Sequence, residues 1–286
     1  MLHCIENGIL QVQIDAFGAQ IKSVKYHGKE RAWQNENGAW QGTAPLLFPV
    51  CGHFGMTVAG KTYDMPAHGF VKKTPFIPEE ISTSAITFVC KANEQTKSVY
   101  PFDFTFKVTY ELIENTLKIT YTVKNDGKAP LPFACGGHDS FALENDVDNY
   151  QIAFENRETL IHYSHDDAGY LTGEKVFYGE NTPALKLPKE YLADGRTLIF
   201  KDLQSRKVQL QTIDGKTLAT LTFDGFANLL VWRATADSKY VCIEPWTNLP
   251  DLAGDEPQEI YDKAGVYVVP QGEEKTLVRE ITYAND

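Results

Sequence analysis

The strongest pattern in the chain is a strict alternation of apolar and polar residues. From Phe102 to Leu112 every second residue is apolar, which is typical of a strand with one face in a core and the other in water. A turn follows at residues 113–116, and the same alternation resumes from Leu117 to Val123. The two segments therefore predict an antiparallel hairpin.

Weaker segments of the same kind are spread over the rest of the chain. They are residues 10–14, 21–26, 85–90, 152–154, 198–200, 208–213, 218–223, 229–233, 240–244, 265–269 and 276–283. One short helix is expected from Pro183 to Leu192, and long loops at residues 33–64 and 155–185. Many short strands with little helix predict an all-β fold, a single large antiparallel β-sandwich. Without a linker, a charge block or a repeat, residues 1–286 read as one domain.

Charge and composition limit the partners and the compartment. The 286 residues are 43% apolar, which is enough for a substantial core, and the formal net charge of −11 repels nucleic acid and anionic lipid. No basic start leads into an apolar run, and no later segment is apolar enough to cross a bilayer, so we expect a cytoplasmic protein. The five cysteines lack any C-x-x-C pair and are expected as reduced thiols. Monomer and homodimer both remain open.

Four segments place a polar or ionisable residue among apolar residues and glycines. They are residues 44–54, 65–70, 133–141 and 242–246, which carry His53, His68, His138 and Glu244. Glu244 ends an apolar strand, and Pro245 lacks the N–H needed to continue regular pairing. A carboxylate desolvated there, beside Trp246, is suited to act as a general base. The alternatives are a carboxylate that pairs with an arginine and histidines that only hydrogen-bond the backbone.

Other chemistries find less support. The three histidines and Glu244 show no short metal-ligand spacing such as H-x-H, so no metal site is predicted. The chain has no G-x-S-x-G elbow, no P-loop and no G-x-G-x-x-G after a strand, so neither a serine nucleophile nor a nucleotide cofactor is expected. Trp246, Trp232 and Phe70 are the aromatic residues best placed to pack against a sugar face.

The four segments together resemble the ordered signature of the aldose 1-epimerase (galactose mutarotase-like) family, in its short bacterial branch. The matching residues are Leu47-Phe48-Pro49 with Gly52, His68-Gly69-Phe70, Gly136-Gly137-His138 with Phe141, and Ile243-Glu244-Pro245-Trp246. This resemblance covers residues 44–252 and implies the galactose mutarotase-like supersandwich. It also implies an isomerase that acts on a hexose without a cofactor or a metal.

The resemblance implies a role for each matching residue. Glu244 corresponds to the general base that removes the proton of the anomeric hydroxyl, and His138 to the general acid that protonates the ring oxygen. His68 corresponds to a second histidine that donates a hydrogen bond near the ring oxygen. His53 stands where many relatives have an arginine that holds sugar hydroxyls, and we expect it to bind substrate with shorter reach. The family's further substrate-binding aspartate corresponds to either Asp194 or Asp202.

Two alternatives accompany the epimerase reading. A non-catalytic carbohydrate-binding or sensing protein on the same fold is favoured by His53 in place of arginine, and disfavoured by the presence of both an acid and a base. A hexose-phosphate 1-epimerase requires a cationic cluster at the mouth of the site. Lys72-Lys73 is an adjacent basic pair close to a motif, and we expect it on a solvated loop.

Overall fold

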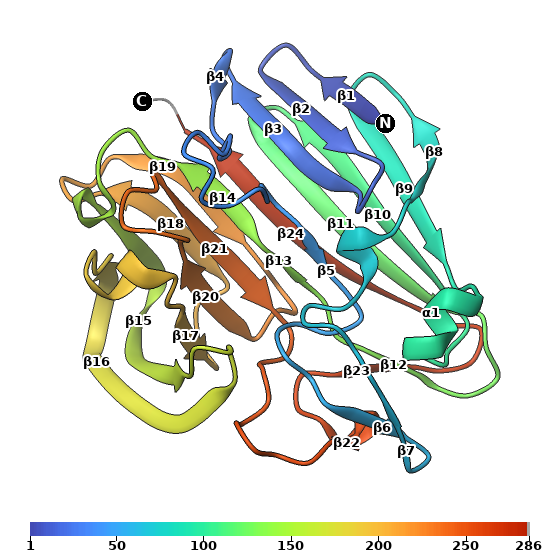
Figure 1. Ribbon diagram of the computed structural model, residues 1–286. Helices are drawn as coiled ribbons and strands as arrows, with labels where there is room; N and C mark the ends of the chain where they lie inside the picture. The colour runs from blue at the N-terminus through green and yellow to red at the C-terminus, as the bar shows by residue number, and fades with distance from the viewer. Residues whose placement is uncertain (285–286) are drawn as a thin grey trace.

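The computed structural model describes residues 1–284 and consists largely of antiparallel strands (Figure 1). Within these residues, a small N-terminal sheet contains β1 (Leu2–Glu6), β2 (Leu10–Asp15), β3 (Gln20–Tyr26) and β4 (Lys29–Glu30). None of the helices in residues 1–284 has the length and apolar character needed to cross a bilayer. The predominance of antiparallel strands confirms the all-β prediction.

A 15-stranded sheet runs through the rest of the described chain. In spatial order its strands are β5 (Leu46–Leu47), β13 (Gly136–Gly137), β21 (Tyr240–Trp246), β20 (Asn228–Trp232), β17 (Leu198–Lys201), β15 (Tyr150–His165), β18 (Lys207–Thr212), β19 (Thr217–Thr222), β24 (Glu274–Tyr283), β11 (Thr116–Asn125), β10 (Phe104–Ile113), β9 (Ala85–Lys91) and β8 (Ile77–Ile81). In addition, β14 (Asp139–Ala142) pairs with β21, and β16 (Leu171–Lys186) pairs with β15.

Short elements complete the described part of the chain. Two small sheets pair β12 (Leu131–Phe133) with β23 (Tyr267–Val269), and β6 (Met56–Val58) with β7 (Lys61–Tyr63) and β22 (Gln258–Glu259). The helices are α1 (Glu94–Val99) and the 3-10 turns η1 (Val71–Lys73), η2 (Val147–Asn149), η3 (Tyr191–Asp194) and η4 (Ile260–Asp262).

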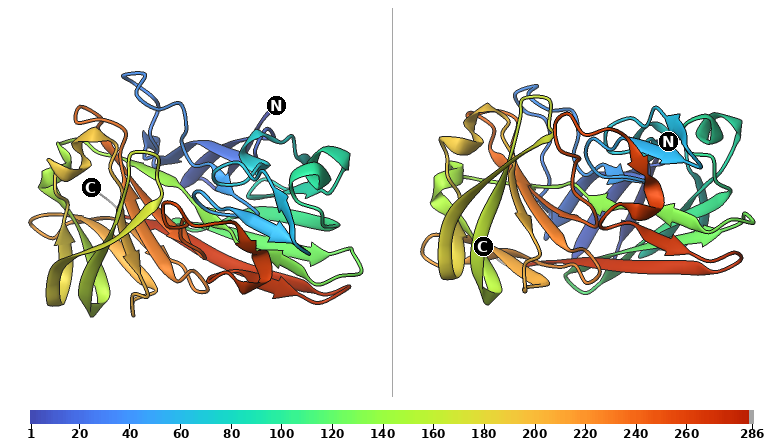
Figure 2. Two further views of the ribbon diagram at one scale, coloured as in Figure 1. Left: turned by 60° about the horizontal axis from the view of Figure 1, so that its bottom comes forward. Right: turned by 90° about the horizontal axis from the view of Figure 1, so that it is seen from below.

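The hairpin predicted from the alternating pattern is present as β10 and β11. The two strands are antiparallel in continuous register, with Val108 opposite Tyr121, and the apolar residues of both point into the core. The N-terminal sheet lies over this region, as Figures 1 and 2 show. The phenolic oxygen of Tyr110 donates to the backbone oxygen of Ala19 at 2.6 Å, which ties the two layers together. The apolar faces predicted from the alternation are therefore the faces that pack in the core between the two layers.

Three sequence predictions are wrong in detail. Residues 155–185 form no loop, because β15 and β16 make a long bulged hairpin there. The helix expected at Pro183–Leu192 is absent, because residues up to Lys186 still pair with β15 and only η3 is helical. The loop expected at 33–64 contains β5, β6 and β7. Pairing between strands, which the local pattern does not reveal, decided all three segments.

Candidate active site

His138 and Glu244 face each other across two neighbouring strands. Gly136 pairs with Trp246 and Asp139 with Ile243 in one common register, which puts His138 opposite Glu244 and Gly137 opposite Pro245. Directly opposed residues have side chains on the same face of the sheet. The result is a distance of 3.4 Å between His138 Nε2 and Glu244 Oε1.

Pro245 explains why this part of the ladder is open. We expected the strand to end at Glu244, but β21 continues to Trp246 and pairs with β20 on its other side. Pro245 has no N–H to donate toward Gly137, and the pairing is interrupted only between β13 and β14. The proline therefore leaves a gap in the ladder beside His138 without ending the strand.

The two glycines before His138 allow other groups to approach closely. A Cβ on Gly136 would lie 2.8 Å from Cδ1 of Trp246, and a Cβ on Gly137 would lie 2.6 Å from Cζ of Arg279. Neither contact is possible for a real side chain without movement of its neighbours. The Gly-Gly pair thus lets the strand fit between the Trp246 indole and the Arg279 guanidinium.

A buried ion pair lies next to the candidate acid. Asp139 and Arg279 are in contact, with side chains 4% and 2% exposed, and Nε of Arg279 donates to the hydroxyl oxygen of Tyr121 at 2.7 Å. Burial raises the pKa of Asp139, and the Arg279 charge offsets part of this rise. Sequence reasoning gave Asp139 no role, whereas the structure makes it the counter-charge of a buried arginine.

His68 has its tautomer fixed by the backbone. The N–H of Gly52 donates to Nδ1 of His68 at 3.0 Å, so Nδ1 carries no proton and Nε2 carries the N–H. Burial lowers the pKa of His68 well below its usual value, and the Lys72 charge adds to the effect. A neutral ring with its remaining N–H available is suited to donate a hydrogen bond to a ligand oxygen.

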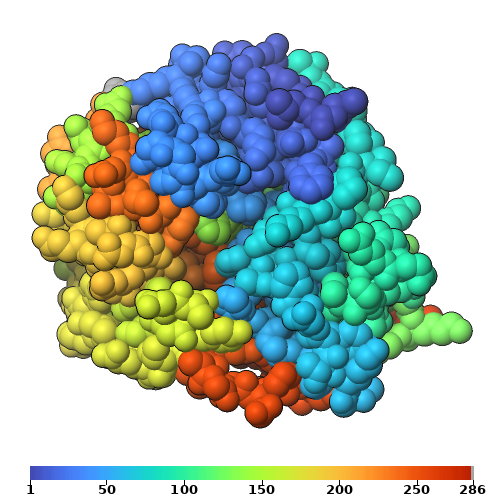
Figure 3. Space-filling view, in the orientation of Figure 1, coloured from blue at the N-terminus to red at the C-terminus, as the bar shows by residue number. Residues whose placement is uncertain are grey.

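These residues surround a cavity of about 600 Å³. Its ionisable lining is His68, His138, Glu244, Lys72 and Lys73; its aromatic lining is Trp40, Trp232 and Trp246; and its amide and hydroxyl lining includes Gln20, Gln41 and Thr197. Figure 3 shows the hollow between the blue and teal N-terminal segments and the yellow and orange C-terminal ones. The volume is typical of a small-molecule site.

Aromatic rings enclose the His138 ring. Trp40 stacks on it with ring centres 5.0 Å apart, and Trp232 meets it edge-on at 5.4 Å. The ring of His68 meets Trp246 edge-on at 5.2 Å. Trp40 was not among the aromatic residues predicted from the sequence, and it lies in the segment 33–64 that was expected to be a long loop. The rings give one side of the cavity an apolar surface of the kind on which sugar faces pack.

Burial dominates the electrostatics of His138 and Glu244. It lowers the pKa of His138 to about 3, and it raises the pKa of Glu244 well above the usual value, with the Asp139 charge adding to that rise. Both shifts favour a neutral imidazole and a protonated carboxyl group. This is the reverse of the protonation expected from the sequence, because both side chains are removed from water.

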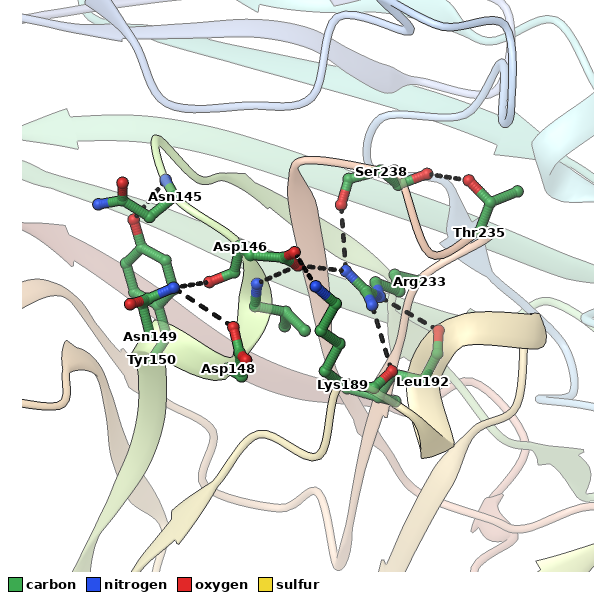
Figure 4. A network of polar contacts seen from close by, with 11 residues as sticks. Asn145, Asp146, Asp148, Asn149, Tyr150, Lys189, Leu192, Arg233, Thr235 and Ser238 are labelled. Carbon is green, nitrogen blue, oxygen red and sulfur yellow. Dashed lines mark hydrogen bonds and ion pairs between the residues drawn. The ribbon is translucent and has the colours of Figure 1, made fainter.

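A second network fixes the wall that contains Trp232. The buried Arg233 donates through Nε to the backbone oxygen of Leu192 at 3.1 Å and through Nη1 to Asp146 at 3.3 Å, as Figure 4 shows. The indole N–H of Trp232 donates to the backbone oxygen of Gly195 at 2.8 Å. These bonds hold segment 189–197 against β20, and the same segment carries the threonine of the cavity wall.

Several predicted ligand residues lie elsewhere. The His53 ring stacks on the ring of Tyr170, with ring centres 4.5 Å apart. The residues of the described chain that line the cavity do not include His53. Phe70 packs near Phe48, with ring centres 6.3 Å apart, and lines a different pocket. Asp194 and Asp202 are exposed beside Arg196 and Lys201, and neither lines the cavity.

A group of metal-ligand types also occurs in the described part of the chain. One potential ligand atom each of His138, Cys242 and Glu244 lies within 4.8 Å of the other two. Burial raises the pKa of both Cys242 and Glu244, so a metal ion would have to displace their protons. The absence of a metal site stays a sequence prediction.

Comparisons with known proteins concern the family of the chain. The sequence profile described as aldose 1-epimerase matches residues 1–281. Protein LacX of Lactococcus lactis subsp. lactis is 30% identical over 262 residues, which cover 86% of this chain and 87% of that protein.

Solved structures of similar proteins cover nearly the whole chain. The galactose mutarotase related enzyme from Lactobacillus acidophilus superposes with a TM-score of 0.89 at 29% identity, covering 100% of this chain and 98% of that one. A galactose mutarotase-like protein from Lactobacillus casei superposes with a TM-score of 0.90 at 28% identity, covering 99% and 100%. On these grounds the chain belongs to the aldose 1-epimerase family.

Proposed function

We propose that this protein is an aldose 1-epimerase that interconverts the α and β anomers of a hexose. The observation that carries the proposal is the contact between Nε2 of His138 and Oε1 of Glu244, which lie 3.4 Å apart. His68 lines the same cavity. Membership of the family supports the reaction class, and the aromatic lining supports a sugar as the ligand.

In the proposed reaction Glu244 removes the proton of the anomeric hydroxyl while His138 gives a proton to the ring oxygen. The C1–O5 bond breaks and an open-chain aldehyde forms. His68 donates a hydrogen bond near the ring oxygen and holds the sugar in place. Rotation about C1–C2 exposes the other face of the carbonyl, and the reversed proton transfers close the ring again. No atom is gained or lost, and the cycle needs no cofactor.

Burial favours a neutral His138 and a protonated Glu244, whereas the proposed reaction starts from a protonated His138 and an ionised Glu244. The two states differ by one proton transfer. Both states hold a single proton between His138 and Glu244, so moving it from the carboxyl group to the imidazole prepares acid and base together. Sugar hydroxyls that hydrogen-bond the two charged groups favour that transfer, because they replace the solvation lost on burial. Binding of the sugar thereby brings the pair into its reactive state.

Two substitutions test the proposal. We expect Glu244→Gln and His138→Asn each to lower the catalysed rate about 10²–10⁴-fold, the usual contribution of one positioned proton transfer. The rate is measured by NMR exchange between anomers on a panel of aldoses, after subtraction of the spontaneous rate. His27→Asn is the matched control, because His27 is exposed, has a positive φ of 48° that asparagine tolerates, and does not line the cavity.

The same experiment separates the enzyme from a carbohydrate-binding protein. Near-normal exchange in both folded variants would overturn the assignment of acid and base. Sugar-induced shifts in the wild-type protein without any catalysed exchange would favour the binder. His53 remains a proposed substrate contact that requires movement away from Tyr170, and His53→Ala tests it through KM. A cytoplasmic location is part of the same proposal.

A further inference from the structure

Two lysines belong to the cavity that contains the acid and the base. Lys72 and Lys73 lie at the end of η1, shortly after His68, and both line the cavity together with His138 and Glu244. We expected this pair on a solvated loop. The structure corrects that expectation for Lys72, which is half-buried, whereas Lys73 is exposed at the cavity mouth.

The backbone under the lysines is clamped by the N-terminal sheet. The N–H of Gly18 donates to the backbone oxygen of Thr74 at 2.8 Å. Gly18 has a φ of +77°, and a Cβ there would lie 2.9 Å from the backbone oxygen of Lys72. The turn is therefore held in place by close contact with the loop after β2, and both lysine side chains project from a fixed base.

The lysine charges are not neutralised by neighbouring carboxylates. Lys72 Nζ donates to the backbone oxygen of Ala67 at 2.9 Å, and in residues 1–284 no carboxylate lies within ion-pair distance of either ammonium group. An ammonium group has three donors, so at least two remain on Lys72. Burial and the neighbouring Lys73 lower the pKa of Lys72 to about 8. The cost of an uncompensated cation is relieved when an anion binds.

The rest of the cavity contains little negative charge. Among residues 1–284 its one carboxylate is Glu244, whose pKa is raised by burial, and burial lowers the pKa of both its histidines. The charge of Lys72 adds to the burial that lowers the pKa of both histidines, so its field reaches the reacting groups. In a protein with a net charge of −11, this cavity is a local positive site.

We propose that the cavity selects a hexose that carries an anionic substituent, with Lys72 and Lys73 holding the anion while the sugar ring lies between His138 and Glu244. The inference rests on the proposed epimerase function and adds the class of substrate to it. A phosphate group and a carboxylate share the required chemistry, and phosphate offers the larger number of acceptors for two ammonium groups.

The test compares neutral and anionic forms of the same sugar. The catalysed anomer exchange of glucose, glucose 6-phosphate and glucuronate is measured by NMR, and binding of each is measured by tryptophan fluorescence. We expect at least one anionic sugar to exceed glucose in kcat/KM by about 10–100-fold, the effect of a hydrogen bond to a charged group. Comparing glucose 6-phosphate with glucuronate identifies whether the lysines bind a phosphate group or a carboxylate.

The lysine variants show whether the preference comes from this pair. Lys72→Met combined with Lys73→Met is expected to bring the ratio of kcat/KM for the anionic sugar to that for glucose down to about one. The rate for glucose itself is expected to shift, because the Lys72 charge acts on both histidines, so the measured quantity is the ratio within each variant. Lys73→Gln alone, at an exposed position, is expected to remove part of the preference without disturbing the fold. Lys91→Gln is the matched control, because Lys91 is exposed and does not line this cavity. Inorganic phosphate is expected to compete in the wild type and not in the double variant.

Failure of the substrate class is distinguishable from failure of the proposed function. Catalysed exchange of glucose without any gain for either anionic sugar overturns the lysine assignment and leaves the epimerase intact. The same holds if the double variant weakens all three sugars equally. If no sugar is exchanged, the epimerase fails, and tighter binding of an anionic sugar that depends on the lysines still supports the anion site.

Discussion

The buried ion pair between Asp139 and Arg279 gives the most demanding test of how the site is built. Substitution of Asp139 by Asn keeps the shape of the side chain and removes its charge. The Arg279 guanidinium, 2% exposed, would then remain buried without a counter-charge, although its Nε–H would still donate to the hydroxyl oxygen of Tyr121. An uncompensated buried charge costs far more than the loss of a surface ion pair.

The size of the effect follows from this burial. Removing one partner of a buried pair costs about 3–5 kcal/mol of unfolding free energy. At roughly 2–4 °C per kcal/mol for a large domain, the melting temperature is expected to fall by about 6–20 °C. The matched control is Glu79→Gln, whose partner Lys107 lies at 3.2 Å with both side chains more than 40% exposed. That change is expected to cost less than about 1 kcal/mol.

Equilibrium urea unfolding, followed by tryptophan fluorescence, measures both variants. A double variant with Asp139→Leu and Arg279→Met is expected to regain at least half of the loss, because apolar residues can replace a buried pair. Tyr121 loses its donor in that variant, so recovery stays incomplete. A loss below about 1 kcal/mol in Asp139→Asn, with an unchanged m-value, would refute the reasoning that the pair is buried and ionised.

Two further predictions concern pH and backbone conformation. Burial, with the charge of His165 in second place, lowers the pKa of His162 to about 4, so between pH 6.5 and 4 the unfolded chain binds a proton there more readily than the folded protein. The stability that the neutral His162 contributes is complete above pH 6.5 and is lost as the pH falls toward 4. His162→Gln should therefore reduce the fall in unfolding free energy between pH 6.5 and 4 by up to about 3 kcal/mol. An unchanged slope of unfolding free energy against pH would contradict the lowered pKa of His162. Gly69→Ala should cost more than about 2 kcal/mol by thermal unfolding, because φ is +70° and the Cβ would lie 1.9 Å from the backbone oxygen of Phe48. The control Gly60→Ala, with a φ of +76° and open space around its Cβ, should cost only about 1 kcal/mol, and equal losses would exclude the close contact as the cause.

Local sequence determined the strands whose two faces differ. The alternation from Phe102 to Val123 predicted β10 and β11, because a period of two places every second side chain in the core. The same pattern contained an unused signal in β24. Arg279 occupies an inward position between Leu277 and Ile281, where a charge must have a partner.

Strand pairing was beyond the local pattern, even between segments that are neighbours in the sequence. Residues 171–186 are mostly exposed polar residues and turn-formers, so nothing in their sequence marks a strand. They become β16 because β15 offers a partner over its whole length. Strand formation of this kind depends on contacts with another strand more than on intrinsic preference.

The candidate site divides in the same way. The residue types of His68, His138 and Glu244, each among glycines and apolar neighbours, marked them as candidates from the sequence, and the resemblance to the family supplied their roles. Only the tertiary structure decided that His138 lies opposite Glu244, that Lys72 joins them and that His53 turns toward Tyr170. The reason is physical: chemistry resides in the side chain, whereas its direction and its pKa depend on strand register and burial, which arise when distant segments pack.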